Sequence, residues 1–148
     1  MNKVYAFREY TRQLEFHLAN MRKGDCCCAG ISSAQCFMIV EIGRKPGISA
    51  KELASILHMD KSSVSRAIEE LVQKEYVERK SSEQDRRWVM LYLLPKGQAH
   101  FEKIECDMNG KFQEILNEIP DEKQEQVIEA LELYVAACTK VKEREEND

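Results

Sequence analysis

Lysine, arginine and serine side chains gather in two neighbouring stretches of this 148-residue sequence. The first stretch is residues 61–66 (KSSVSR), and the second ends in Asp85, Arg86 and Arg87. Lysine and arginine attract phosphate, and serine and arginine can hydrogen-bond the edges of bases. These residue types therefore favour the binding of a nucleic acid.

Two roles are expected within this group. Bases in a major groove would be read by Ser62, Ser63, Ser65 and Arg66. Phosphate would be attracted by Lys61, Arg66, Arg79, Lys80, Arg86 and Arg87. The alternatives are an ordinary solvated helix face for residues 61–66 and, for Asp85 and Arg87, a salt bridge that closes a hairpin. That same salt bridge would also orient the arginine.

Cysteines are the second group with potential chemistry, because Cys26, Cys27 and Cys28 form a run in a polar loop and Cys36 follows it. Such thiols can be oxidised to a sulfenic acid or a disulfide, or can hold a thiophilic ion such as arsenite or Cu(I). The alternative is a loop that tolerates three thiols without using them. A structural zinc site is disfavoured because no two cysteines are separated by two intervening residues, the usual spacing of paired zinc ligands.

Signs of an enzyme are missing from the sequence. It contains no Gly-rich phosphate loop, no nucleophile elbow and no metalloprotease pattern. The histidines are isolated, and we expect surface or half-buried imidazoles rather than ligands. No cofactor is required by this interpretation, and the effector would be a thiophilic metal or a small molecule.

A helix-turn-helix would position the first basic stretch. Capping boxes are predicted where Ser32 precedes Gln35 and where Ser49 precedes Glu52, so helices should begin at both places. Asp60 is a good N-cap for a helix over 61–74, in which the apolar stripe Val64, Ile68, Leu71 and Val72 would be buried. On the preceding helices we expect a buried face made of Cys36, Ile39, Val40, Gly43, Leu53, Ala54 and Leu57.

A β-hairpin would position the second basic stretch. Residues 76–80 and 88–94 have the composition of strands, and Pro95 should end the second one. The polar connection SSEQDRR would project into solvent, where exposed arginines can enter a minor groove.

Long helices are expected at both ends of the chain, over 3–22, 96–116 and from 121 onward. The last carries a narrow apolar seam of Val127, Leu131, Tyr134, Cys138 and Val141. One small lobe cannot cover all these apolar faces, so we expect a homodimer. Cys106 and Cys138 should pack there as small hydrophobic residues. The predicted fold class is mainly α with a small β-hairpin wing: a DNA-binding lobe over 32–96, and a helical dimerisation region over 1–31 and 97–148.

Charge is unevenly distributed along the chain. Its net charge is −4, but residues 61–96 hold eight Lys/Arg against six Asp/Glu, and residues 97–148 hold six against fourteen. Local rather than total charge decides which face meets phosphate, so the acidic C-terminal part should stay away from DNA. No membrane span or secretory signal is predicted, and we expect a cytoplasmic protein.

The sequence resembles the MarR family of winged helix-turn-helix regulators over nearly its whole length. The segments that carry the likeness are Ser32–Gln35, Glu52–Ala54, Val64–Arg66 with Leu71 and Val72, Tyr76–Arg79, and Asp85–Arg87 with Leu93, Lys96 and Gly97. One departure is Leu94-Pro95, where the family usually has threonine and an acidic or similar residue. This changes how the last strand passes into the long helix.

The resemblance implies a triangular homodimer that binds a palindromic operator, with half-sites about one helical turn, roughly 34 Å, apart. It also implies that Arg87 enters the minor groove, that Asp85 holds it in place and that Arg86 contacts phosphate. We therefore expect a transcriptional repressor, or less commonly an activator, whose DNA release is controlled by a small effector, an oxidant or a thiophilic metal. The alternatives are a thiol-based redox or metal sensor, and a winged-helix module that binds another protein.

Overall fold

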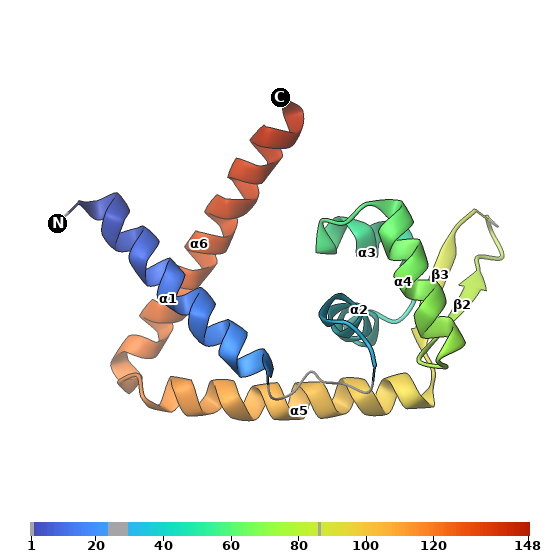
Figure 1. Cartoon of the computed structure of the whole chain (residues 1–148), viewed down its shortest axis with the longest axis horizontal. Coiled ribbons are helices and arrows are strands. Elements are labelled where there is room, and N and C mark those ends of the chain that lie inside the picture. Colours follow the sequence, from blue (N-terminus) through green and yellow to red (C-terminus); the bar gives the residue numbers. More distant parts are fainter. Residues whose placement is uncertain (1, 24–29, 86) are drawn as a thin grey trace. The chain divides into compact units, whose positions relative to one another are not determined.

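The computed structural model of the chain describes residues 2–23, 30–85 and 87–148. Helices and strands follow in the order α1 (Lys3–Lys23), α2 (Ser33–Arg44), β1 (Ile48–Ser49), α3 (Ala50–Leu57), α4 (Lys61–Gln73), β2 (Val77–Ser81), β3 (Val89–Leu93), α5 (Pro95–Asn117) and α6 (Asp121–Asn147) (Figure 1). The expected fold, mainly helical with a β-hairpin wing, is confirmed. The chain forms two compact units, residues 1–107 and 108–148.

The core of the first unit forms where α2, α3 and α4 meet the sheet. Met38, Ile39 and Ile42 of α2 are fully buried, together with Leu53, Val64, Ile68, Leu71, Val77 and Leu91. The predicted stripe of α4 is therefore confirmed, although Val72 is only half-buried. On α2 the predicted face was partly wrong: Val40 and Gly43 are half-buried, while Met38 and Ile42 lie deeper.

The sheet has three antiparallel strands in the order β1-β3-β2, rather than the two strands that the sequence predicts. Ile48 pairs with Leu91, and Ser49 pairs with Met90. Strand β1 is only two residues long, too short for an alternating pattern to be visible. The hairpin itself is confirmed, with Val77 opposite Leu93 and Ser81 opposite Val89.

Two serines start helices as expected. The Ser32 hydroxyl accepts a bond from Gln35 N, and the Gln35 side chain accepts one from Ser32 N, which completes a capping box. The Ser49 hydroxyl likewise accepts from Glu52 N (3.0 Å). The carboxylate of Glu52, however, pairs with Lys45 Nζ, so this second box is formed only by its serine half.

The turn between α3 and α4 begins at His58, which has a left-handed backbone (φ 54°). Asp60 then caps α4: its carboxylate accepts from Ser63 N (3.1 Å) and from the Ser63 hydroxyl (2.6 Å). These two bonds, the hydroxyl bond first, hold the pKa of Asp60 below its ordinary value. The helix-turn-helix is thus fixed at its second helix by a side chain that the sequence identifies.

Pro95 explains the departure at the end of the wing. It occupies the first position of α5, where a proline needs no N–H donor and its φ already suits a helix. Leu94 N donates to Tyr76 O (2.9 Å), which ties this junction to the start of β2. Gly97 then lies so close to Tyr76 O that an added Cβ would be 2.1 Å from that oxygen.

Within the part of the chain that the structure describes, no helix is long and apolar enough to cross a membrane.

We predict that Asp60→Ala lowers the melting temperature and that Asp60→Asn lowers it less, because asparagine retains a capping oxygen. The carboxylate's contribution to stability is present above the ordinary aspartate pKa and is lost as pH falls through the lowered pKa of Asp60. The Ser63 amide resonance should therefore shift with a midpoint below the ordinary aspartate value. An unchanged melting temperature in Asp60→Ala would contradict the cap.

Gly97→Ala should reduce the free energy of unfolding by about 1–3 kcal/mol, because the new methyl group meets a backbone oxygen that is itself held by Leu94 N. The matched control is Gly110→Ala in the same helix, where the added Cβ has nothing within 4 Å. That control should raise stability by up to about 1 kcal/mol. Urea unfolding at one protein concentration measures both, and equal effects would rule out the close approach.

Candidate nucleic-acid interface

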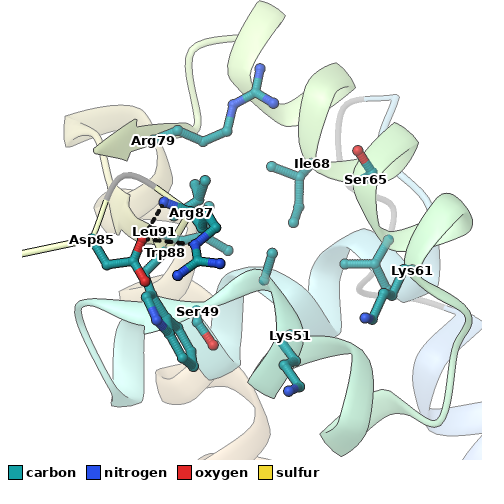
Figure 2. Close-up of a pocket in the computed structure, with 13 residues that line it drawn as sticks. Ser49, Lys51, Lys61, Ser65, Ile68, Arg79, Asp85, Arg87, Trp88 and Leu91 are labelled. Carbon is teal, nitrogen blue, oxygen red and sulfur yellow. Dashed lines mark hydrogen bonds and ion pairs between the residues drawn. The ribbon is translucent and has the colours of Figure 1, made fainter. Parts of the chain in front are cut away.

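A pocket of about 610 Å³ lies between α4, the start of α3 and the hairpin (Figure 2). Its apolar lining includes Val64, Ile68 and Leu91. The positively charged residues that line it are Lys51, Lys61, Arg79 and Arg87. Side chains from the helix-turn-helix and from the wing therefore share one surface.

On α4, the exposed side chains of the predicted set are Lys61, Ser62, Ser65 and Arg66. Ser65 and Lys61 face the pocket, whereas Arg66 Nε lies 3.4 Å from Ser62 O on the helix. Ser63 differs from the other serines, because it is half-buried and its hydroxyl donates to Asp60. The same hydroxyl would therefore have to serve both the helix cap and the base contact that we expect of Ser63.

In the wing, the structure brings Asp85 and Arg87 together. Asp85 Oδ1 accepts from Arg87 N (3.0 Å) and from Arg87 Nε (3.2 Å). These bonds, the backbone bond first, hold the pKa of Asp85 below its ordinary value, so the carboxylate stays charged at neutral pH. The Arg87 side chain is nevertheless 91% exposed, so its guanidinium is oriented and still open to a ligand. Arg86, also predicted to contact DNA, lies outside the described residues.

The two cations of β2 are already engaged within the protein. Arg79 forms an ion pair with Glu69 of α4, and Lys80 pairs with Glu78 (3.3 Å) and lies over the Tyr92 ring. Pairs this exposed contribute little to stability. They do reduce the positive charge that each side chain presents. Arg87 is paired as well, with Asp85, but its side chain is 91% exposed, against 39% for Arg79 and 60% for Lys80, so Arg87 is the stronger candidate for phosphate.

Sequence reasoning missed two residues of this surface. Lys51 lies in the first turn of α3, and its position two residues after the Ser49 cap was the available signal. Trp88 was assigned to a strand, yet it precedes β3, lines the pocket and is 48% exposed. It is also the only tryptophan of the chain.

The cysteines give a different outcome. Cys26, Cys27 and Cys28 lie outside the described residues. Cys36 is buried in the core, and its Sγ lies 3.8 Å from His100 Nε2, while burial, with Lys103 nearby, lowers the pKa of His100. Cys106 and Cys138 are exposed, so the single chain does not show the packing expected of them. No group of three or more possible metal ligands occurs among the described residues.

Comparison with known proteins agrees with this geometry. A sequence model described as the MarR family matches residues 29–87. The chain is 32% identical over 132 residues to the HTH-type transcriptional regulator BilQ of Clostridium symbiosum, which covers 89% of this chain and 90% of that protein.

Solved structures show the same fold. FabT of Streptococcus pneumoniae, crystallised in complex with DNA, has a TM-score of 0.76 and 23% identity, covering 93% of this chain and 94% of FabT. The PcaV regulator of Streptomyces coelicolor, solved with its natural ligand, has a TM-score of 0.70 and 15% identity, covering 87% and 91% of the two chains. With a winged helix-turn-helix, a basic surface across it and a relative that matches about nine-tenths of both chains, the chain belongs to the MarR family of DNA-binding transcriptional regulators, which are not enzymes.

Proposed function

We propose that this chain is one subunit of a homodimeric repressor that binds a palindromic operator and releases it when an effector binds. The observation that carries the proposal is the Asp85–Arg87 pair, which presents an exposed guanidinium beside the exposed start of α4. Residues 32–96 form the DNA-binding lobe in this proposal, and residues 1–31 and 97–148 form the dimerisation region.

On DNA, the exposed start of α4 enters the major groove, where Ser62, Ser65 and Arg66 reach base edges. Arg87 extends from the wing to the adjacent minor groove, and Lys51 and Lys61 bind phosphates between the two. The likeness to FabT, which was crystallised with DNA, supports this placement.

Dimerisation is supported by the apolar surface of the terminal helices. Tyr10 on α1 is 72% exposed, and α6 exposes Leu131 and Val141 of the predicted seam together with Ile128, Leu133 and Val135. Surfaces of this kind mark sites of protein association. A second copy that covers them would place two α4 helices on successive major grooves, roughly 34 Å apart.

Effector control is supported by one relative and by one stretch of the sequence. PcaV was solved with a natural ligand, which supports a small-molecule effector. The run Cys26-Cys27-Cys28 supports an oxidant or a thiophilic metal instead, because neighbouring thiolates suit both. In each case the effector would alter the spacing of the two lobes, and a misplaced lobe loses its share of the contacts.

Arg87→Ala should weaken binding to the operator several-fold, because one exposed phosphate- or groove-binding cation is removed. The slope of log affinity against log salt should fall by about two, because the dimer loses one such cation from each subunit. Arg144→Ala in α6 is the control: it removes the same charge from outside the proposed surface and should leave affinity unchanged. Fluorescence anisotropy with an operator selected from random DNA measures affinity, and light scattering checks that the dimer survives. Wild-type affinity in Arg87→Ala would disprove the wing contact.

Replacing Cys26, Cys27 and Cys28 with serine should leave operator affinity unchanged and abolish DNA release by hydrogen peroxide or arsenite. Cys106→Ser is the matched control, since that thiol is exposed on α5. Release that persists in the triple variant would exclude the cysteine run as the sensor.

A further inference from the structure

A buried amide joins the start of α2 to the second half of α4. Gln35 is 3% exposed, and its side-chain Oε1 accepts from Ser32 N (2.9 Å). Its Nε2 donates to Ala67 O (3.3 Å) and to Glu70 Oε2 (2.8 Å). Gln35 therefore does more than complete the capping box that the sequence predicts.

The partners fix which way the amide points. Its oxygen faces an N–H donor, and its nitrogen faces a carbonyl and a carboxylate, both of which only accept. The reversed amide would place oxygen against two acceptors. The side chain therefore bridges the two helices in one orientation, with each of its polar atoms bonded.

A second bond links the same two regions. Lys74, which caps the C-terminal end of α4, donates from Nζ to Gly30 O (2.8 Å). Residues 30–35 thus hold the second half of α4 at two points, Glu70 and Lys74, which we call the α2–α4 clasp. Lys96 Nζ in turn donates to Lys74 O (3.0 Å).

The clasp constrains the orientation of α4, which the apolar core alone defines less sharply. Val64, Ile68 and Leu71 bury α4 through apolar contacts, which resist separation but have little directional preference. Hydrogen bonds weaken steeply when their angles change. The bonds of Gln35 therefore resist rotation and tilt of α4, the movements that would displace its exposed side chains.

The clasp also holds the negatively charged carboxylate of Glu70. Glu69 and Glu70 lie on the helix that we propose enters the groove, where free carboxylates would repel phosphate. Glu69 pairs with Arg79, and Glu70 is bonded to the amide of Gln35. Both acids are held by partners within the protein.

We infer that Gln35 is a positioning residue for operator recognition: it sets the orientation of α4 and holds Glu70 away from DNA without touching DNA itself. This inference rests on the proposed role of α4 as the reading helix. Loss of the clasp should reduce recognition of the operator more than general attraction to DNA, because phosphate attraction survives a small tilt whereas base contacts do not.

Gln35→Glu separates this role from helix capping. Glutamate at this position still accepts from Ser32 N, so the start of α2 is retained. Its carboxylate now faces Glu70 and Ala67 O, so the bridge is replaced by repulsion. We expect operator affinity to fall about five- to tenfold, with random-sequence DNA bound within about twofold of wild type.

The rescue variant is Gln35→Glu combined with Glu70→Gln, in which the amide and the carboxylate exchange places. Its operator affinity should return to within about twofold of wild type, which a double-mutant cycle would record as coupling. Gln73→Glu is the charge-matched control, because it makes the same change on the exposed side of α4 and should leave the ratio of operator to random-DNA affinity unchanged.

Several results would overturn the inference: wild-type operator affinity in Gln35→Glu, an equal loss on operator and random DNA that follows a loss of folded protein, or no rescue by Glu70→Gln. Arg87→Ala, measured in parallel, tests the proposed DNA surface itself. If Arg87→Ala and Arg66→Ala bind operator as tightly as wild type, the proposed function fails independently of Gln35.

Discussion

The burial of one side of α4 is the contact on which the proposed DNA surface depends. Val64, Ile68 and Leu71 recur at helical spacing and are all buried against α2, α3 and the sheet. Because the helix turns once in 3.6 residues, fixing these side chains inward fixes Ser62, Ser65 and Arg66 outward. The turn at His58 and the cap at Asp60 then determine where that outward face begins.

Charge is sorted around this helix over short distances. The exposed start of α4 carries lysine, serine and arginine, and its second half carries Glu69 and Glu70, each bonded to a side chain from another element. The wing also pairs an acid with a base, since the carboxylate of Asp85 is bonded to Arg87. Carboxylates are thus present at the basic surface, but they orient other groups within the protein, and a net negative charge is compatible with binding a polyanion.

Local chemistry made the helices predictable from sequence. Helix starts are indicated by Ser32, Ser49 and Asp60, because a side-chain oxygen must satisfy free backbone N–H groups at the start of a helix. Strand β1 was not predicted, because its two residues form a strand only by pairing with β3, and the sequence around them carries no sign of that pairing. The α2 face was misplaced for a related reason: Met38 and Ile42 are selected by what packs against them, so tertiary contact decides between neighbouring helical faces.

The residues of the candidate site also divide into those that local sequence predicts and those that tertiary contacts decide. Lys61, Ser65 and the Asp85–Arg87 pair were predictable from residue type and position, and the structure places them around one pocket. Lys51 and Trp88 were not, because their membership depends on how the start of α3 approaches the hairpin. Ser63 was predicted as a reader and is found bonded to Asp60, since a cap and a groove contact use the same hydroxyl.

The exposure of Lys61, Ser62, Ser65 and Arg66 has a consequence for how such a protein diverges. None of these side chains belongs to the core, and substitutions at surface positions of this kind usually change stability by no more than about 0.5 kcal/mol. If this face reads the operator as proposed, duplicated copies of the gene could drift to new operators by altering it, without any compensating change in the buried core. Selection on stability and selection on sequence preference would act on separate residues of one short helix.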